Sequence, residues 1–294
     1  MRTPALLILF SIVTSQGLAD QINSPGCGVT RPLGRIYNGK KIGRIHMPWM
    51  LHIKAMFMTV LSPSSSKLET VNCGGSILSP RFILTAAQCV GTGTHRAVDV
   101  SVYYNATHPG KGAFAPVEDF KAHPDYGKRP TGYDIALIKL KDPLEFDQSL
   151  RPICLPTQQL HLTNKEALVA GWGLTNDWTI TPWLHYFKTK VVSFDYCRKW
   201  YTALLKEDAA GSAELVCTKA KGKSACEGDA GGPLMIWEGN GHRYLQVGVA
   251  SFGSETGGCS NQKSPNVFTR VSHFVPWVSK MVREEWETSQ DGVW

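Results

Sequence analysis

Short apolar segments separated by turn-forming residues make up most of the chain. The clearest of these segments are residues 75–78, 82–84, 135–140, 167–170 and 245–251. β-Strands flanked by Gly, Pro, Asn and Ser give this spacing, whereas an amphipathic helix needs a longer periodic stretch. The pattern therefore predicts many antiparallel strands, arranged as barrels or sandwiches, and so an all-β fold.

One segment near the C-terminus follows the helical period instead. Its apolar residues recur at spacings of three and four, at Phe274, Trp277, Val278, Met281 and Val282. Ser272 is a candidate N-cap for this helix. We expect the apolar stripe to pack against the strands as core rather than to bind a partner. The polar residues from Glu284 onward predict a frayed tail.

The N-terminus has the pattern of a secretory signal. Arg2 precedes an apolar run from Leu6 to Val13, and small residues follow at Gly17-Leu18-Ala19. The run is shorter than the roughly 20 residues that a membrane-spanning helix needs. We predict a signal peptide over residues 1–19 and a secreted, extracellular mature chain that begins at Asp20, with a membrane anchor as the alternative.

Composition and charge narrow the class of protein only a little. The chain has 294 residues, of which 43% are hydrophobic, and this is enough for one large domain or two small ones. The formal net charge is +7, and basic residues gather at Lys188, Lys190, Arg198, Lys199, Lys219, Lys221 and Lys223. A solvated basic face explains these residues, and a site for an anionic polysaccharide is the alternative. We do not expect a nucleic-acid partner for a secreted protein.

The cysteines predict a disulfide framework. There are eight of them in a chain that carries a secretory signal, and spacing alone leaves about 105 pairings open. The histidines are scattered along the sequence, so we expect neither a metal site nor another cofactor.

Several separated motifs, in a fixed order, identify a family. Glu227–Pro233 reads Glu-Gly-Asp-Ala-Gly-Gly-Pro, and Leu84–Cys89 reads Leu-Thr-Ala-Ala-Gln-Cys. Further landmarks are Met47–Trp49, Cys73–Ser76, Asp134–Leu137, Gly171–Gly173 and Pro265–Val271. Together they resemble the chymotrypsin and trypsin family of serine proteases, from Ile36 to about Glu285.

The resemblance implies an architecture and a processing site. The family fold is two six-stranded antiparallel β-barrels with a cleft between them, here over residues 36–286, and residues 287–294 form a polar tail. Gly34–Gly39 resembles the activation junction, where cleavage after Arg35 frees the amino group of Ile36. The leader, residues 20–35, would stay tethered afterwards. The implied disulfides are Cys27–Cys154, Cys73–Cys89, Cys197–Cys217 and Cys226–Cys259.

The catalytic positions depart from the family pattern. Its base, acid and nucleophile positions hold Gln88, Asp134 and Ala230. A glutamine amide has no basic nitrogen near neutral pH, and alanine has no hydroxyl group. Losing the serine or the base of such a triad slows catalysis about a million-fold or more, which is roughly 8 kcal/mol of barrier. The sequence therefore predicts no functional catalytic residue and no enzyme. A rescuing base at His95, His108 or His123 is the alternative.

Other parts of the site follow the family more closely. The resemblance implies that the N–H groups of Gly228 and Ala230 still form an oxyanion-type pocket, because these donors belong to the backbone. It also implies that Asp229 pairs with the amino group of Ile36 after cleavage. Either the cleavage switch is retained and alters affinity for a partner, or the motif is inherited without a working switch.

The specificity pocket departs again. The resemblance places Ser224, Ser251, Gly253 and Asn266 around it. Ser224 replaces the acidic residue of trypsin-like members, and Asn266 replaces a glycine that admits the substrate side chain. We expect Asn266 to plug the pocket in part.

One glycosylation sequon is acceptable. It begins at Asn105, since the triplet at Asn23 ends in proline.

These observations predict a secreted, inactive serine protease homologue. Its partners would be proteins, namely an active protease, an inhibitor or a receptor, toward which it would act as a cofactor, decoy or cascade regulator. Two alternatives stay open. One is an enzyme with a rearranged active site, and the other is a polysaccharide-binding module centred on the lysine cluster.

Overall fold

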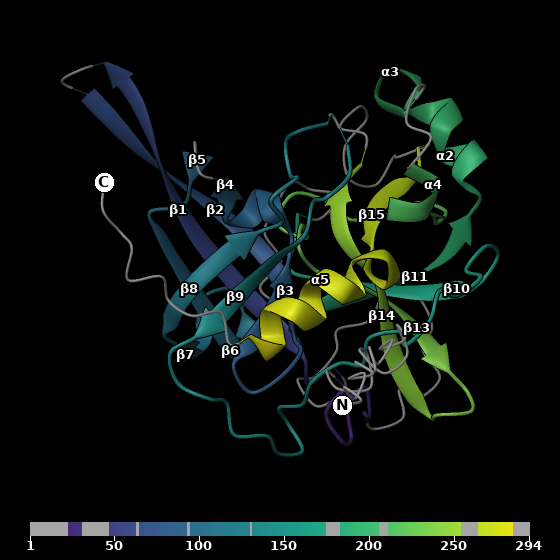
Figure 1. The fold of residues 1–294 in the computed structure, drawn as a ribbon, viewed down its shortest axis with the longest axis horizontal. Coiled ribbons are helices and arrows are strands. Elements are labelled where there is room, and N and C mark those ends of the chain that lie inside the picture. Colours follow the sequence, from purple (N-terminus) through teal and green to yellow (C-terminus); the bar gives the residue numbers. More distant parts are fainter. Residues whose placement is uncertain are drawn as a thin grey trace, which may run out of the picture.

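A computed structural model describes residues 23–30, 47–62, 65–92, 95–129, 131–174, 183–205, 211–253 and 264–284. These residues form two large β-sheets and a C-terminal helix (Figure 1). The predicted all-β class with two barrel-like sheets is confirmed. The signal peptide, the tail 287–294 and the junction at Arg35 and Ile36 lie outside the described residues.

The first sheet has seven strands in the order β7-β6-β1-β2-β3-β9-β8, all paired antiparallel. Their bounds are β1 (Met50–Ser62), β2 (Ser65–Ile77), β3 (Phe82–Thr85), β6 (Asp99–His108), β7 (Lys111–Ala115), β8 (Val117–Ala122) and β9 (Ala136–Leu140). A 3-10 turn, η2 (Ala87–Cys89), and a small hairpin of β4 (Gly91–Thr92) and β5 (His95–Arg96) follow β3.

Pro116 explains why this sheet counts seven strands rather than six. The two ends of the strand order, β7 and β8, are separated along the chain by Pro116 alone. Proline has no N–H group to give to a ladder, so it interrupts a strand. Since β7 pairs with β6 and β8 pairs with β9, residues 111–122 act as one broken strand that returns the sheet to its starting edge.

The second sheet is a closed barrel of six strands in the order β10-β11-β12-β15-β14-β13. Their bounds are β10 (Glu166–Gly171), β11 (His185–Val192), β12 (Leu215–Lys219), β13 (Pro233–Glu238), β14 (Arg243–Phe252) and β15 (Asn266–Arg270). Its interior holds an apolar cluster that includes Val169, Val191 and Phe268. The strands predicted from the apolar segments all lie in these two sheets.

Four helices complete the described chain. They are α2 (Phe194–Trp200), α3 (Thr202–Leu205), α4 (Gly211–Glu214) and α5 (Val271–Arg283). Helix α5 is the predicted C-terminal helix, and its apolar face packs on the main hydrophobic core. The predicted cap was wrong, because strand β15 runs directly into the helix. Arg270 therefore holds the N-cap position, and Ser272 lies inside the first turn.

Buried contacts join the two sheets at their boundary. The indole N–H of Trp49 in the loop before β1 donates to the sulfur of Met235 in β13. Ser76 of β2 donates through its hydroxyl group to the side-chain oxygen of Gln246 in β14, at 2.5 Å. Because polar groups are buried at low cost only when they are paired, these contacts fix one relative position of the sheets.

Disulfides tie the peripheral elements to the sheets. The structure contains Cys27–Cys154, Cys73–Cys89 and Cys197–Cys217. Cys226 is also disulfide-bonded, and Cys259, its predicted partner, lies outside the described residues. The described part of the leader, residues 23–30, is thus held on the second barrel by the Cys27 bridge. The N–H group of Gly28 adds a hydrogen bond to the carbonyl of Pro152.

Candidate functional site

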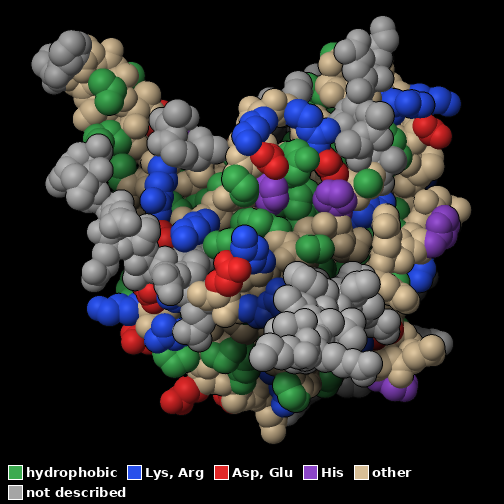
Figure 2. All heavy atoms as spheres, in the orientation of Figure 1, with side chains coloured by type: hydrophobic (Ala, Val, Ile, Leu, Met, Phe, Trp, Pro, Cys, Tyr) green, Lys and Arg blue, Asp and Glu red, His purple; other side chains and the backbone are tan. Residues whose placement is uncertain are grey.

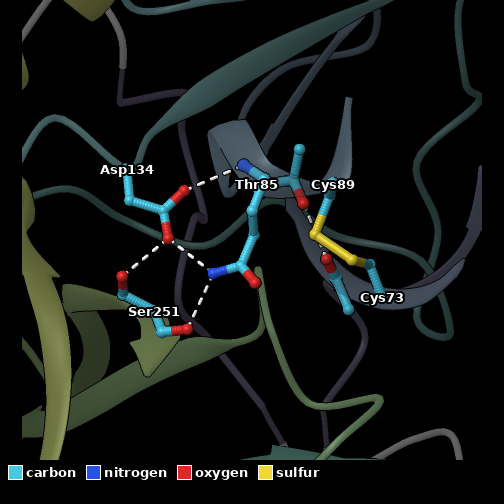
Figure 3. Close-up of a disulfide and its surroundings, with 7 residues drawn as sticks. Cys73, Thr85, Cys89, Asp134 and Ser251 are labelled. Carbon is cyan, nitrogen blue, oxygen red and sulfur yellow. Dashed lines mark hydrogen bonds between the residues drawn. A yellow bond between two sulfur atoms is a disulfide. The ribbon is translucent and has the colours of Figure 1, made fainter. Parts of the chain in front are cut away.

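Gln88 and Asp134 reach the site from neighbouring strands of the first sheet. Gln88 lies in the turn η2 directly after β3, and Asp134 comes two residues before β9, which pairs with β3. The Cys73–Cys89 disulfide ties the turn to β2 (Figure 3). The position of Gln88 is therefore set by a strand pairing and a covalent bridge together.

Gln88 and Asp134 are connected by two hydrogen bonds. The side-chain Nε2 of Gln88 donates to Asp134 Oδ2 at 2.6 Å. The backbone N–H of Gln88 donates to Asp134 Oδ1 at 2.9 Å. A carboxylate can only accept hydrogen bonds, so these contacts orient the amide with its nitrogen toward Asp134.

Ser251 completes the set of donors around the carboxylate. Its hydroxyl group donates to Asp134 Oδ2 at 2.6 Å, and its backbone carbonyl accepts from Gln88 Nε2 at 2.7 Å (Figure 3). Ser251 belongs to β14 of the second barrel. The carboxamide of Gln88 thus links the first sheet to the second barrel. The sequence places Ser251 only at the wall of the pocket, since nothing in its local sequence indicates a partner 117 positions away.

The carboxylate of Asp134 is buried, and this affects its titration. Burial raises the pKa of Asp134, while the hydrogen bonds from Ser251 and Gln88 act in the opposite direction. Thr269 also donates from its hydroxyl group to the backbone carbonyl of Asp134 at 2.8 Å. The residue is therefore fixed from both sheets.

The chemistry open to Gln88 follows from its contacts. Both hydrogens of Nε2 have acceptors, one on Asp134 and one on Ser251. The remaining polar atom of the amide is the carbonyl oxygen Oε1, which accepts hydrogen bonds and is not a base near neutral pH. Because Gln88 is exposed, its side chain offers a neutral acceptor to the solvent side of the site.

The loop that carries Ala230 is fixed beside this cluster. The N–H group of Gly74 donates to the carbonyl of Ala230 at 2.7 Å, and the N–H group of Gly231 donates to the carbonyl of Ala250 at 2.8 Å. Gly231 has φ +80°, and a side chain there would collide with the hydroxyl group of Thr85. The methyl group of Ala230 is therefore held next to the strands that lead to Gln88 and Ser251.

The predicted oxyanion-type donors lie in the same loop. Gly228 has φ +92°, a conformation that favours glycine. Among the described residues, the N–H groups of Gly228 and Ala230 donate no backbone hydrogen bond. Both donors are thus available to a ligand. The prediction that they act together on one oxyanion stays a prediction.

The carboxylate of Asp229 is buried against the end of β10 and the residues that follow it. This carboxylate accepts from the N–H groups of Gly173 at 2.8 Å and Cys226 at 3.0 Å. Gly171 and Gly173 leave no room for side chains, because an added Cβ would overlap this carboxylate. Burial raises the pKa of Asp229 to about 6. Its predicted partner, the amino group of Ile36, lies outside the described residues.

The predicted specificity pocket contains a hydrogen bond at its base. The hydroxyl group of Ser224 donates to Oδ1 of Asn266 at 2.6 Å, and the side chain of Asn266 is buried. Asn266 starts strand β15, opposite Thr218 of β12. Ser251 and Gly253 lie along and just after the neighbouring strand β14. The pair of Ser224 and Asn266 carries no charge. That it plugs the pocket stays a prediction.

The histidines proposed as substitute bases have other contacts. His95 stacks on Phe57 at a centroid distance of 5.2 Å, and His108 lies 4.5 Å from the ring of Trp183. His123 packs among Tyr133, Phe274 and Trp277, and burial lowers its pKa. These ring contacts explain the three side chains as packing groups.

His52 is a further buried histidine, which the sequence did not single out. Its Nδ1 accepts from the N–H group of Gly110 at 3.1 Å, and its ring lies edge-on to Trp172. Burial lowers its pKa to about 4, so the ring is neutral at physiological pH.

The basic cluster and the sequon have contacts of their own. Lys190 and Lys219 lie directly opposite each other on β11 and β12, and the ammonium group of Lys219 lies over the rings of Tyr196 and Trp200. In the sequon, Asn105 lies in β6 with φ +50°, and its amide is 3.5 Å from the hydroxyl oxygen of Ser149.

Among the described residues, no group of three or more His, Cys, Asp or Glu side chains is arranged to hold a metal ion. No helix within the same part of the chain is both long enough and apolar enough to cross a membrane.

Comparisons with known proteins agree on one family. The sequence profile named Trypsin matches residues 36–278. Ovochymase of Halocynthia roretzi is 32% identical over 254 residues, which cover 83% of this chain and only 15% of ovochymase. The clotting factor G beta subunit of Tachypleus tridentatus is 30% identical over 294 residues, with 95% of this chain and 91% of that protein covered.

A solved structure supports the same assignment. HL collagenase matches with a TM-score of 0.69 and 28% sequence identity. The match covers 84% of this chain and 99% of that one. The likeness therefore extends over both sheets.

Proposed function

Because the chain belongs to the trypsin family, we propose that it is a secreted, catalytically inactive member that acts by binding other proteins. One observation carries this proposal. The position of the catalytic base holds Gln88, whose amide is committed to Asp134 and Ser251. Without a basic nitrogen at that place and without a hydroxyl group on Ala230, the site has no group to attack a peptide bond.

The remaining polar groups suit an extended polypeptide. The free N–H groups of Gly228 and Ala230 can donate to a carbonyl or a carboxylate, and the side-chain oxygen of Gln88 can accept from an N–H group. Main-chain groups of a bound segment supply both kinds of partner. The filled base of the pocket at Ser224 and Asn266 argues against recognition by a deeply inserted side chain.

The names of the relatives suggest the setting. The Tachypleus protein is named as a subunit of a clotting factor, and two relatives from Holotrichia diomphalia are named as phenoloxidase-activating factors. We therefore place this chain among components of proteolytic cascades, as a cofactor or decoy for an active protease or its inhibitor. The N-terminal signal and the disulfides support secretion.

The enzymatic part of the proposal is tested with a covalent probe. The mature protein, cleaved and uncleaved after Arg35, is incubated with a fluorophosphonate probe and with a panel of peptide amides. We expect no labelling and no turnover above a buffer control. Stoichiometric labelling, or turnover that copurifies with the protein, would overturn the claim of inactivity and favour a rearranged active site.

The binding part is tested with a variant that fills the cleft. Ala230→Phe places a ring over the free N–H groups, and Leu204→Phe on the surface of α3 serves as the matched control. A protein captured from the source fluid should lose affinity for the first variant and keep it for the second. Equal binding to both variants would contradict recognition through the cleft.

A further inference from the structure

Strands β1 and β2 form a ribbon that extends beyond the first sheet. β1 pairs with β6 only through residues 51–56, and β2 pairs with β3 only at Ser76 and Ile77. The outer halves of the two strands pair with each other, from Phe57 opposite Glu69 to Ser62 opposite Ser65. Figure 1 shows this ribbon projecting from the molecule at the upper left.

The outer half of β1 is an open edge without charge. Within the described residues, Phe57–Ser62 has backbone pairing to β2 alone, so one side of the strand is left without a ladder. No residue from Ala55 to Ser62 is charged or is a proline. Exposed edges are usually protected by charges, by prolines or by a covering element. In the part of the chain that the structure describes, the outer half of β1 has none of these, and its pairing with β2 shifts register only once, between Val60 and Ser62.

The edge of β2 differs in this respect. Its outer half carries Lys67 and Glu69, which form an exposed ion pair at 3.0 Å. Charged side chains on an edge strand disfavour pairing with another chain. The two edges of one ribbon are therefore unequal, and β1 is the open one.

Apolar side chains extend along one face of the same ribbon. Met58 and Leu68 lie directly opposite each other, and Val60 follows on the same face. Their exposed fractions are 49%, 62% and 70%. Figure 2 shows hydrophobic side chains on the projecting ribbon, away from the body of the molecule.

We propose that this ribbon is a dimerisation surface, on which the β1 edge of one copy pairs antiparallel with the β1 edge of a second copy through Phe57–Ser62. An edge strand is complementary to itself under a two-fold axis, because the spacing of its N–H and C=O groups is the same in both copies. With Val60 of one copy opposite Val60 of the other, Met58 pairs with Ser62, and the five residues give an overlap of about 17 Å. Met58 and Val60 of the two copies would then share one apolar face.

Charge favours the ribbon over other surfaces for contact between copies. The chain has a formal net charge of +7, so two copies carry the same net charge and repel each other at long range. The uncharged run at Ala55–Ser62 meets itself without like-charge pairs. Because the ribbon projects, a contact through it keeps the rest of the two molecules apart. Salt screens charges that are more than about 8–10 Å from each other, so this distance weakens the repulsion. The contact would present two clefts on one particle and so raise avidity for a repeated partner.

The test compares two lysine substitutions in the mature protein by sedimentation equilibrium. Val60→Lys puts a charge on the ribbon face, and Leu204→Lys makes the same change at an exposed apolar residue of α3. We expect a concentration-dependent dimer for the wild type and for Leu204→Lys. Val60→Lys should raise the dimer dissociation constant at least about tenfold, because its two copies bring like charges together. A wild type that stays monomeric, or a dimer that tolerates Val60→Lys, overturns the proposal.

Hydrogen exchange locates the contact independently. Amide protection should rise with protein concentration in the peptide that covers Phe57–Ser62, and should not change in β13. A dimer without that protection overturns the proposal. Sedimentation with phosphatidylcholine vesicles supplies a second comparison. A monomer that binds the vesicles through Val60 would assign the ribbon to a lipid surface instead.

Discussion

The side chains of Gln88 and Asp134 form a hydrogen bond of 2.6 Å. Gln88 lies in the turn after β3, and Asp134 lies two residues before β9. The same amide reaches Ser251 on the second barrel. Gln88 thus keeps the structural part of the role of a catalytic imidazole, which is to donate to a buried aspartate. It lacks the chemical part, which is to accept a proton.

Removing this amide should cost stability. Gln88→Ala leaves Asp134 with the hydroxyl group of Ser251 and backbone donors, so we expect a loss of about 1–2 kcal/mol in the free energy of unfolding. Gln88→Glu should cost more at neutral pH, because two carboxylates then face each other. Urea denaturation measures both. Gln158→Ala, at an exposed glutamine, is the control and should change little. An equal loss in the control would contradict the assigned role of Gln88.

The sequence could predict the members of this site but not all of their contacts. Gln88, Asp134 and Ala230 stand in motifs of fixed local spacing, and these motifs are visible in one chain. The bonds from Ser251 to Asp134 and from Thr269 to its backbone carbonyl connect residues more than 100 positions apart. Only the packing of one sheet against the other determines them.

The ribbon shows a second limit of sequence reasoning. Within β1, the run Ala55–Leu61 is apolar except for Thr59, a pattern typical of a buried strand. The first half of β1 is buried, whereas its outer half extends past the end of β6 and is exposed. The length of β6 decides whether the outer half of β1 is buried or exposed. The sequence of β1 does not contain that length.

Restoring two side chains should not restore a trypsin-like enzyme. Gln88→His with Ala230→Ser returns the base and the nucleophile, but Ser224 and Asn266 are still hydrogen-bonded to each other at the predicted base of the pocket. We expect no cleavage of amide substrates with Lys or Arg at the cleaved bond, because their charge finds no partner there. Cleavage of these amide substrates is compared between the double variant and a quadruple variant that also carries Ser224→Asp and Asn266→Gly. Turnover of such substrates by the double variant alone would contradict the plugged pocket.

A binding assay tests the pocket without catalysis. Ser224→Asp with Asn266→Gly removes the hydrogen-bonded plug and supplies an acidic group. This variant should bind p-aminobenzamidine, whereas the wild type and Asn266→Gly alone should not, because the amidinium needs both space and a counter-charge. Fluorescence of the ligand reports the complex. Binding by the wild type would show that the pocket is open.

The leader should remain attached after cleavage at Arg35. Cys27 is bridged to Cys154, and the N–H group of Tyr244 also donates to the carbonyl of Gly28 at 2.9 Å. On electrophoresis, the cleaved protein should run as one species without reductant and release the leader peptide with it. Cys27→Ser with Cys154→Ser should release the leader in both conditions. Release from the wild type without reductant would contradict the tether.

Asp229 should make the uncleaved protein less stable as pH rises through the mildly acidic range. Burial raises its pKa to about 6 from an ordinary value of 3.8, so the folded state binds this proton more tightly than the unfolded state does. The resulting stabilisation is complete below the unfolded pKa and is lost as pH increases through about 6. The size of the effect is of the order of 3 kcal/mol. It is measured as the difference between the unfolding free energies of wild type and Asp229→Asn across this range, since the amide keeps the shape and does not titrate.

Asp147→Asn is a control for which the unfolding free-energy difference should change with pH in the opposite direction. A backbone and a side-chain hydrogen bond from Ser149 lower the pKa of Asp147, so its contribution is present above the ordinary pKa and is lost as pH falls. The two difference curves should therefore slope in opposite directions. In the protein cleaved after Arg35, a working switch supplies the amino group of Ile36 to Asp229, which lowers the pKa and reverses the first slope. The same falling curve before and after cleavage would show that the motif is inherited without a working switch.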